Sequence, residues 1–524
     1  MNDTQASSSQ PIRFFHRGQV VEVQGVHPTR SVLDWLREDA RCTGTKEGCN
    51  EGDCGACTVV IGELAEPGAA EAVGGLKLQT VNACIQFLPT LHGKALFTVE
   101  DLKGRCGGPA PGRHAAQPLH PVQQAMVDCH GSQCGFCTPG FVMSLWSAYE
   151  HHSEQGTRPS RQQLADELSG NLCRCTGYRP ILDAGQKMFD LPAVRLDTAP
   201  VVAALQTLRR EGTFDYAAPL GQRTDRFHAP VTLDELAALR EAKPQARILA
   251  GSTDVGLWVN KMFRDLGDII YVGDVAEMKR IEEGADALYI GAGASLEDAW
   301  RAIVQRAPTL EDVWLRFASL PIRNAGTLGG NVANGSPIGD TAPLLIALGG
   351  SVVLHRQGAE RVLPVTDFYL GYQKNDLQPG EFVRAVRVPL PEPDVAVHAW
   401  KVSKRPEQDI SAVALATALR VEGGRIVAAG IGVGGMAAVS SRAPRTEQAL
   451  LGLAVDQPGL RDSPAMRAAW QAMHDEFDPL DDHRASAAYR RRAAANLVLR
   501  SCLSVAGAGQ APRLGELAPM EVQP

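Results

Sequence analysis

The first hundred residues alternate between apolar and polar positions in the short runs that are typical of β-strands. Residues 12–23 predict two short strands joined by a turn at Arg17-Gly18. Ser31 stands where the N-cap of a short amphipathic helix is expected. Residues 58–61 read Thr-Val-Val-Ile, which predicts a buried strand. These elements together predict a small α+β domain.

The pattern changes to helical periodicity between residues 118 and 190. Apolar residues at helical spacing follow Pro139 and Pro180, and proline is favoured in the first turn of a helix, where its missing N–H costs nothing. The segment is therefore predicted to hold two antiparallel helix hairpins. Residues 191–221 mix proline, alanine and charged residues without a clear period, which predicts an extended linker.

From residue 222 onward the pattern is again α+β. Residues 232–241 predict a helix, and residues 247–250 predict a strand that runs into Gly-Ser-Thr. Residues 430–435 satisfy the G-x-G-x-x-G spacing of dinucleotide-binding folds. The helix that this fingerprint needs begins only near residue 446, so a glycine-bearing strand is the better interpretation. The predicted domains are residues 11–102, 118–190, 222–395 and 396–507, followed by a tail over 508–524.

Chain length, net charge and cysteine count fit a multidomain protein that does not act mainly on nucleic acid or membrane. A chain of 524 residues is too long for one core. A net charge of −7 gives no basic surface for nucleic acid or anionic lipid. The polar amino terminus and the short apolar runs predict no signal peptide and no membrane-spanning segment. Twelve cysteines are too few for a disulfide scaffold and predict a reducing, cytoplasmic setting.

The cysteines are the first candidates for chemistry. Cys49, Cys54 and Cys57 follow the spacing C-x4-C-x2-C, and Cys84 comes later, which is the thiolate pattern of a plant-type [2Fe–2S] centre. Glycines within this loop let the backbone wrap around a cluster and bring amides to its sulfurs. A zinc site usually takes two close pairs of ligands, which this loop lacks. The spacing therefore favours iron and sulfide over zinc.

Four further cysteines form two close pairs in the helical segment. Cys134 and Cys137 precede one predicted helix, and Cys173 and Cys175 precede the other. The partial positive charge of each helix start would stabilise a dianionic four-thiolate site. By spacing alone, C-x2-C with C-x-C fits either an iron–sulfur cluster or zinc, and both alternatives remain open.

Residues 129–140 (Cys-His-Gly-Ser-Gln-Cys-Gly-Phe-Cys-Thr-Pro-Gly) and 170–180 (Gly-Asn-Leu-Cys-Arg-Cys-Thr-Gly-Tyr-Arg-Pro) resemble the second [2Fe–2S] domain of the xanthine oxidase/dehydrogenase family. Residues 46–57 resemble that family's plant-type domain. The resemblance implies a β-grasp ferredoxin-like domain followed by a helical [2Fe–2S] domain. The implied ligands of the two clusters are Cys49, Cys54, Cys57, Cys84, Cys134, Cys137, Cys173 and Cys175. The cysteines left without a role are Cys42, Cys106, Cys129 and Cys502.

Two further segments resemble the FAD domain of the same family and of the carbon monoxide dehydrogenase flavoprotein. They are residues 249–256 and the run of small residues 322–340, which is expected to be unable to pack a core. That fold has two subdomains and is not a Rossmann fold, and a C-terminal α+β flavoprotein domain follows it. The resemblance puts residues 249–256 on the FAD pyrophosphate and residues 326–331 on the other side of the cofactor.

Further side chains are implied at the flavin. Ser336 and Asp340 would contact the ribityl and phosphate portions, while Phe317 and Tyr372 would lie near the isoalloxazine ring. Gln408 stands where several NAD-reducing relatives carry an acidic residue. The implied cofactor-binding residues are Leu249, Ala250, Gly251, Ser252, Thr253, Asp254, Val255, Gly256, Phe317, Gly326, Thr327, Gly330, Asn331, Ser336, Asp340 and the cationic Lys401.

The resemblance also implies a function. Two clusters and FAD form an electron-transfer chain, and the sequence offers no nucleophile or acid–base pair for substrate chemistry, so no catalytic residue is predicted. The domain order resembles the small subunit of bacterial xanthine dehydrogenases. Because the chain ends soon after the flavoprotein domain, the molybdenum–pterin centre is expected on a separate large subunit, in an assembly of two small and two large chains.

Electrons from hypoxanthine or xanthine would enter the second cluster, with Gln133 facing the pterin, and pass through the first cluster and FAD to NAD+. Two alternatives stay open. The same architecture would serve a molybdenum hydroxylase of aldehydes or N-heterocycles, or the chain would be a stand-alone iron–sulfur flavoprotein reductase.

Overall fold

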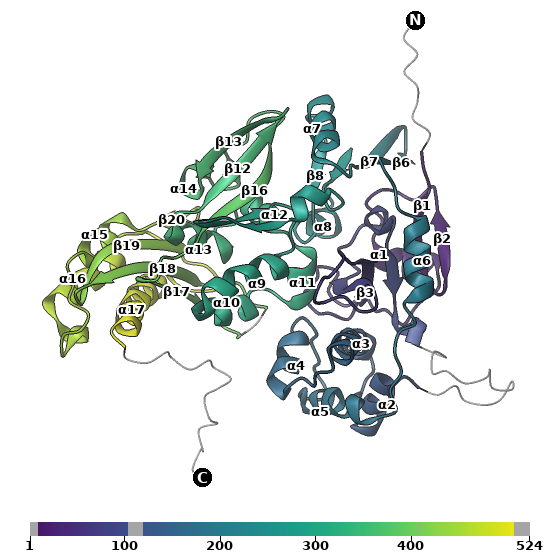
Figure 1. The fold of residues 1–524 in the computed structure, drawn as a ribbon, viewed down its shortest axis with the longest axis horizontal. Coiled ribbons are helices and arrows are strands. Elements are labelled where there is room, and N and C mark those ends of the chain that lie inside the picture. Colours follow the sequence, from purple (N-terminus) through teal and green to yellow (C-terminus); the bar gives the residue numbers. More distant parts are fainter. Residues whose placement is uncertain (1–8, 103–118, 407, 508–524) are drawn as a thin grey trace, which may run out of the picture. The chain divides into compact units, whose positions relative to one another are not determined.

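The computed structural model describes residues 9–102, 119–406 and 408–507 (Figure 1). The chain divides into two compact units. The first unit consists of residues up to 276 together with 319–326, and the second consists of 277–318 together with the residues from 327 onward. The predicted tail over 508–524 and Cys106 lie outside the described residues.

The first unit begins with a sheet in the order β2-β1-β5-β3-β4, in which β1 and β5 are parallel and the other neighbours are antiparallel. Its strands are β1 (Ile12–His16), β2 (Gln19–Val23), β3 (Thr58–Leu64), β4 (Leu76–Asn82) and β5 (Ala95–Phe97). The predicted turn at Arg17-Gly18 is confirmed, with positive φ angles of 52° and 83°, as a two-residue hairpin turn requires.

The predicted helix after this hairpin is short. It is α1 (Val32–Asp34), which continues as a π-helical turn over Trp35–Asp39. The Ser31 hydroxyl accepts a hydrogen bond from the Asp34 amide at 3.0 Å, so the predicted N-cap is confirmed.

Four helices of the first unit form a group beside this sheet (Figure 1). They are α2 (Pro121–Asp128), α3 (Thr138–Gln155), α4 (Arg161–Glu167) and α5 (Arg179–Lys187). In this group α3 contacts the strands, and the other three helices pack against α3 or one another. Pro139 and Pro180 lie in the first turns of α3 and α5, as predicted. Helix α3 lies against β3 and β4, and the rings of Phe97 and Trp146 meet at a centroid distance of 5.3 Å.

The prediction of an extended linker over residues 191–221 is wrong. This segment holds α6 (Ala199–Thr207) and β6 (Phe214–Leu220). Val201 and Leu205, four positions apart on α6, are each 1% exposed and belong to the core beside α3. A weak helical pattern becomes a stable helix here because tertiary packing supplies the burial.

Strand β6 opens the second sheet of the first unit, whose order is β6-β7-β9-β8. The other strands are β7 (Arg223–Ala229), β8 (Arg247–Leu249) and β9 (Ile269–Tyr271), and the helices are α7 (Leu233–Ala242), α8 (Val255–Asn260) and α11 (Leu320–Ala325). The expected helix near residue 232 is confirmed, since the Thr232 side chain caps α7.

The second unit contains an antiparallel sheet in the order β10-β11-β16-β12-β13 and a second one in the order β17-β18-β19-β20. The strands are β10 (Ile281–Glu283), β11 (Ala287–Gly291), β12 (Ser351–Arg356), β13 (Ala359–Pro364), β14 (Tyr369–Gly371), β15 (Lys374–Asn375), β16 (Phe382–Pro389), β17 (Val395–Val402), β18 (Val413–Glu422), β19 (Arg425–Gly434) and β20 (Ser441–Arg442). The helices are α9 (Leu296–Arg306), α10 (Glu311–Arg316), α12 (Leu328–Asn334), α13 (Thr341–Leu348), α14 (Val365–Phe368), α15 (Pro444–Leu450), α16 (Pro464–His474) and α17 (Ala487–Val505).

The G-x-G-x-x-G segment lies on β19 and the turn after it, which confirms the predicted glycine-bearing strand. A Cβ on Gly432 would lie 2.0 Å from the Pro343 carbonyl oxygen, and one on Gly430 would lie 2.3 Å from that of Ala347. These glycines therefore let α13 lie directly against β19, and their spacing serves packing.

The expectation that the small residues of 322–340 cannot pack a core is wrong. Leu328 and Val332 on α12 are fully buried. A Cβ on Gly329 would lie 2.2 Å from the Cβ of Ala292, so the glycine allows α12 to approach its neighbour closely. Small side chains here serve close backbone packing.

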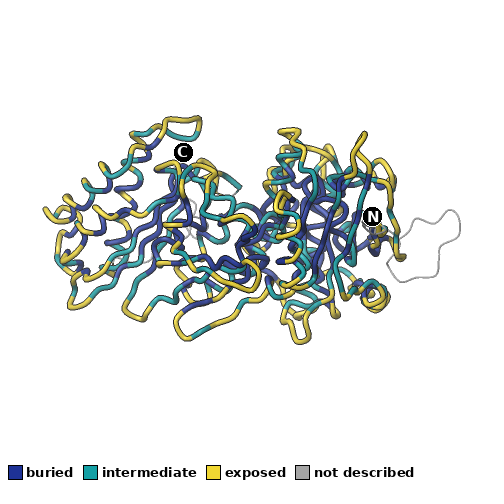
Figure 2. Tube along the Cα trace, turned by 90° about the horizontal axis from the view of Figure 1, so that it is seen from above, coloured by how far each residue is buried: buried dark blue, intermediate teal, exposed yellow. Residues whose placement is uncertain are grey.

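Burial follows the strands and the inward faces of the helices within each unit, while the connecting loops are exposed (Figure 2). No helix in the described part of the chain is long and apolar enough to cross a bilayer.

Candidate functional site

The first cysteine set, which is Cys49, Cys54, Cys57 and Cys84, is brought together in the first unit. The Cys49 sulfur accepts hydrogen bonds from the amides of Asp53 and Cys54, each at 3.3 Å. Cys57 and Cys84 are 2% and 1% exposed. Backbone amides directed at a ligand sulfur are typical of iron–sulfur sites, where they tune the centre.

The thiols of the first cysteine set also hydrogen-bond with one another. The Cys49 sulfur accepts from the thiols of Cys54 and Cys84, and these contacts lower the pKa of Cys49. Donation to Cys49 and to Cys57, together with burial, raises the pKa of Cys84. Metal ligation requires each of these thiols to be deprotonated.

Glycines hold the loop of the first set close to its sulfurs, as the sequence predicted. A Cβ on Gly48 would lie 2.7 Å from the Cys54 sulfur. Gly52 has a φ of 80°, and its carbonyl accepts a hydrogen bond from the Asn82 side chain at 2.7 Å. The tight loop needs glycine at both places.

The second cysteine set, which is Cys134, Cys137, Cys173 and Cys175, lies beside the first turns of α3 and α5. The thiols of Cys134 and Cys175 hydrogen-bond with each other, and so do those of Cys137 and Cys173. Burial, together with donation to Cys173, raises the pKa of Cys137 to about 12. Cys134 and Cys175 are exposed, so one pair lies at the surface and the other further inside.

Asn171 joins the two cysteine sets, and the sequence did not single it out. Its side-chain nitrogen donates to the Gly55 carbonyl and to the Thr58 hydroxyl, each at 3.1 Å. Its side-chain oxygen accepts from the Ser144 hydroxyl at 2.6 Å. Asn171 is 4% exposed, so this amide forms a buried polar link between the loop of the first set and α3.

The backbones of the two sets also meet directly. The Leu172 amide, next in sequence to Cys173, donates to the Cys54 carbonyl at 3.0 Å. A Cβ on Gly140 would lie 2.1 Å from the Gly55 carbonyl oxygen. One hydrogen bond therefore connects a residue of the first set to the neighbour of a residue of the second.

The segment 249–256 lies at the carboxyl end of β8 and leads into α8. Ser252 has a φ of 62°, an uncommon conformation for a residue other than glycine. It is 3% exposed, and its hydroxyl has no hydrogen-bond partner among the described residues. A strained residue with a buried, unsatisfied hydroxyl is costly and indicates a polar ligand at this place.

Close backbone contacts fix this segment. A Cβ on Gly251 would lie 1.8 Å from the Ala325 carbonyl oxygen and 2.8 Å from the Cα of Gly326. The Gln86 side chain donates to the Gly251 carbonyl at 3.1 Å. Within the first unit the structure thus brings together two of the predicted cofactor positions, Gly251 and Gly326.

The other predicted cofactor residues lie in the second unit. Lys401 and Asp340 form an ion pair at 2.5 Å, with side chains 2% and 4% exposed. The Ser411 hydroxyl donates to the other oxygen of the same carboxylate. The Thr327 hydroxyl accepts from the Gly330 amide at 3.0 Å and so caps α12. Asp340 and Lys401 are therefore brought together as a buried pair.

The aromatic candidates differ in their surroundings. Phe317 is 7% exposed, and its ring packs edge-on against Trp300 at a centroid distance of 5.8 Å. Tyr372 is 64% exposed.

The polar candidates Asn331 and Ser336 lie on and just after α12. Asn331 lies on the helix, and the Ser336 carbonyl accepts a hydrogen bond from the Gly339 amide in the turn that follows.

Four known domain families match the chain. They are the 2Fe-2S iron-sulfur cluster binding domain over residues 14–87, the [2Fe-2S] binding domain over 99–186, the FAD binding domain in molybdopterin dehydrogenase over 222–391, and the CO dehydrogenase flavoprotein C-terminal domain over 398–505.

Whole-chain comparisons agree with these matches. Xanthine dehydrogenase of Drosophila pseudoobscura pseudoobscura is 33% identical over 94% of this chain and 39% of its own length. Aldehyde oxidase 4 of Cavia porcellus is 30% identical over 80% of this chain and 34% of its own length. This chain therefore carries two [2Fe–2S] domains and an FAD-binding domain of the kind found in molybdopterin dehydrogenases. It spans about two fifths of the length of the curated relatives that it matches.

A solved structure resembles just over half of this chain. Carbon monoxide dehydrogenase from Hydrogenophaga pseudoflava has a chain that matches with a TM-score of 0.50 and 28% identity, over 55% of this chain and 98% of that chain. The predicted fold class, and the prediction of two [2Fe–2S] clusters and FAD, are confirmed by the domain matches.

The residues fit the groups that these domains hold. A [2Fe–2S] cluster takes a pair of thiolates on each iron, and both cysteine sets are arranged as contacting thiols. Residues 9–102, 119–406 and 408–507 contain no group of three or more His, Cys, Asp and Glu side chains that could hold a metal ion. For FAD, the unpartnered Ser252 hydroxyl suits a phosphate oxygen.

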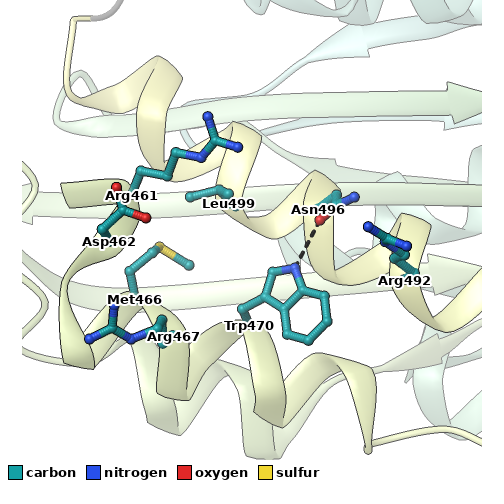
Figure 3. Close-up of a pocket in the computed structure, with 8 residues that line it drawn as sticks. All are labelled: Arg461, Asp462, Met466, Arg467, Trp470, Arg492, Asn496 and Leu499. Atoms are coloured by element: carbon teal, nitrogen blue, oxygen red, sulfur yellow. Dashed lines mark hydrogen bonds between the residues drawn. The ribbon is translucent and has the colours of Figure 1, made fainter. Parts of the chain in front are cut away.

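A separate surface pocket lies between α16 and α17 in the second unit (Figure 3). It has a volume of about 410 Å³, and its lining includes Arg461, Arg467, Arg492 and Trp470. The Trp470 indole donates to the Asn496 side chain at 2.9 Å, as the dashed line in Figure 3 shows. None of the predicted cofactor residues lines this pocket, so it is distinct from the FAD prediction.

Proposed function

We propose that the chain is the electron-transfer subunit of a xanthine dehydrogenase. It relays electrons from a molybdenum–pterin subunit, which hydroxylates hypoxanthine or xanthine, through two [2Fe–2S] clusters to FAD and on to NAD+. Iron–sulfur clusters pass single electrons, whereas FAD takes up two and releases them as a hydride. The observation that supports a relay is the hydrogen bond of 3.0 Å between the Leu172 amide and the Cys54 carbonyl.

The cysteines supply the proposed cluster ligands. Cys49, Cys54, Cys57 and Cys84 hold the first cluster, and Cys134, Cys137, Cys173 and Cys175 hold the second. The chain's own part in the relay is to fix the distance between the two sets, which the Asn171 side chain and the facing glycine backbones do.

The exposed pair of the second set suggests where electrons enter. Cys134 and Cys175 lie at the surface with Gln133, and the Phe136 ring beside them is 47% exposed. An exposed apolar ring next to exposed ligands suits a protein partner that excludes water. The proposed partner is a large molybdenum subunit, with Gln133 facing the pterin, in an assembly of two small and two large chains.

FAD is proposed to bind where the family resemblance implies. Residues 249–256 contact its pyrophosphate, and residues 326–331 lie on its other side. Ser336 and Asp340 serve the ribityl and phosphate portions, and the flavin contacts are Phe317, Tyr372 and Lys401. The proposed domains remain residues 11–102, 118–190, 222–395 and 396–507.

Xanthine is the proposed substrate of the partner because the xanthine dehydrogenases among the relatives reach 33% identity. The second candidate is a hydroxylase of aldehydes or N-heterocycles, which the 30% identity to Aldehyde oxidase 4 favours. Gln408 stands where several NAD-reducing relatives carry an acidic residue. The identity of the electron acceptor should therefore be tested with NAD+ and with artificial acceptors.

The test is to purify the chain alone and with its partner. The chain alone should carry iron, acid-labile sulfide and FAD, yet leave xanthine untouched until a large molybdenum subunit is added. Oxidation of an aldehyde or an N-heterocycle in place of xanthine would select the second candidate. Reduction of FAD by a soluble donor, with no molybdenum chain co-purifying, would select a stand-alone reductase.

Replacing one ligand in either set should remove one cluster. The wild-type chain should contain about four irons, and Cys84→Ser or Cys173→Ser about two, because a [2Fe–2S] cluster needs all its thiolates. Iron analysis and electron paramagnetic resonance check this, and each variant should lose a different signal. Cys42→Ser, at a buried cysteine outside both sets, is the control and should keep the full iron content. Zinc in place of iron in the wild-type chain would refute the relay.

Ser252→Ala should weaken FAD binding without harming the apoprotein. The lost hydrogen bond to a phosphate should lower affinity about 10- to 100-fold, since hydrogen bonds to charged groups are the stronger ones. Thermal stability of the FAD-free chain should not fall, because the hydroxyl has no partner there. Fluorescence titration with FAD measures the affinity. Ser440→Ala is the control, since its hydroxyl is also buried and unpartnered among the described residues. Equal affinity in both variants would place the pyrophosphate elsewhere.

A further inference from the structure

The carboxyl end of α8 contacts the backbone of the first cysteine set. The Asn260 side chain donates to the Cys84 carbonyl at 2.8 Å and to the Asn50 side chain at 3.1 Å. The Lys261 ammonium donates to the Cys49 carbonyl at 2.5 Å. Both carbonyls belong to proposed cluster ligands, so the end of one short helix holds two of the ligand residues.

The beginning of α8 is fixed against the same part of the chain. A Cβ on Gly256 would lie 2.8 Å from the Cβ of Ile85, which follows Cys84 in sequence. The Gln86 side chain donates to the Gly251 carbonyl at 3.1 Å. A helix of six residues, about 9 Å long, is therefore anchored at both ends on residues 84–86. This anchoring fixes where the Lys261 side chain leaves the backbone.

The charge of Lys261 matters because reduction adds one negative charge to a site that already holds four thiolates. A cation close to such a site stabilises the reduced form more than the oxidised form and so raises the reduction potential. Glu51 lies 3.9 Å from the Lys261 ammonium and offsets part of this effect. The side chains of Lys261 and Glu51 are both 42% exposed, so salt should screen both charges.

We propose that Lys261 is a positioning residue that raises the reduction potential of the first cluster and so favours electron transfer towards it from the second cluster. Asn260 keeps the end of α8 on the cluster loop, so that the ammonium stays over the Cys49 carbonyl. The inference rests on the proposed function in one respect, namely that the first cysteine set holds a [2Fe–2S] cluster.

The test is a redox titration of the full chain with FAD, followed by electron paramagnetic resonance. The added electron comes from dithionite and reduces one ferric iron of the cluster. Lys261→Met should give the first cluster a more negative midpoint potential, whereas Glu51→Gln should give it a more positive one. Lys261→Arg keeps the charge and should restore the wild-type value. The second cluster should keep its midpoint potential in all these variants.

Two readouts separate this role from a structural one. Iron and sulfide contents should stay at the wild-type level, and the difference between Lys261→Met and wild type should shrink as ionic strength rises. Unchanged midpoint potentials in Lys261→Met and Glu51→Gln, with full iron content, would overturn the inference. The absence of any iron–sulfur signal from the wild-type chain would instead refute the proposed function, so the two failures are distinguishable.

Discussion

Lys401→Met should destabilise the second unit by about 3–5 kcal/mol, because it leaves the Asp340 carboxylate buried without its cation. The side chains of this pair are 2% and 4% exposed, and among the described residues the Ser411 hydroxyl would remain as the polar partner of the carboxylate. Denaturant unfolding of the full chain, followed by tryptophan fluorescence, measures the loss. The transition that reports on the second unit should move to a lower midpoint.

The double variant Lys401→Met/Asp340→Leu tests whether the loss of stability comes from the unpaired carboxylate. Replacing both partners of a buried ion pair by apolar groups is often close to neutral, so the double variant should recover most of the loss. Arg405→Met is the control, because the Arg405–Asp409 pair is longer, at 3.6 Å, with Arg405 55% exposed. Its removal should cost less than about 1 kcal/mol. Equal losses in the single and double variants would show that the pair is not the source of the stability.

The same variants test the cofactor role of Lys401. If Lys401 or Asp340 contacts FAD, as the family resemblance implies, the double variant should fold with near wild-type stability and still bind FAD more weakly. If the pair is structural alone, FAD affinity should recover together with stability. Measuring both quantities on one set of proteins separates a contact with FAD from a contribution to folding.

The parts of the fold that were predictable from the sequence are those encoded by neighbouring residues. The turn at Arg17-Gly18, the Ser31 N-cap and the prolines that open α3 and α5 each depend on a few adjacent positions. The cysteine spacing is equally local, because one short loop must supply several sulfurs. Chemistry that demands a fixed arrangement within about ten residues is therefore recognisable without the fold.

The failures all involve partners that are distant in sequence. Helix α6 has only Val201 and Leu205 as buried anchors, and their partners lie in the core beside α3. The small residues around Gly329 were expected to be unable to pack, yet they let backbones approach closely at Ala292. A glycine that makes room for a cofactor and a glycine that makes room for another backbone look alike in a sequence. The difference lies in which group the glycine contacts in the folded chain.

Asn171 is the clearest case of a site residue that the sequence could not reveal. Its hydrogen-bond partners Thr58 and Gly55 are 113 and 116 positions away, and Ser144 is 27 positions away. An asparagine two positions before a cysteine carries no signal of this role. The same holds for Lys261, whose partner Cys49 is 212 positions away. Contacts between domains decide how the two clusters are held, and only the folded chain shows them.

Asn171→Leu should destabilise the first unit by about 2–4 kcal/mol and disturb both cysteine sets together. The leucine cannot replace the amide, so the Ser144 hydroxyl would lose its acceptor, and the Thr58 hydroxyl and the Gly55 carbonyl would lose a donor. The Thr58 hydroxyl still donates to the Gly55 carbonyl at 2.8 Å, which limits the loss. Denaturant unfolding measures the stability, and electron paramagnetic resonance should show altered signals from both clusters.

A double-mutant cycle with Ser144→Ala isolates the buried link. Because Ser144 and Asn171 are in direct contact, the cycle should give a coupling energy within the range of about 0.5–3 kcal/mol. Asn496→Leu, at an exposed asparagine on α17, is the control and should cost less than about 1 kcal/mol. A change confined to one cluster signal, or additive effects of Ser144→Ala and Asn171→Leu, would contradict a shared link. A change in both cluster signals would instead mean that the buried Asn171 amide fixes the geometry between the two cysteine sets. It would then also fix the distance over which each electron is transferred.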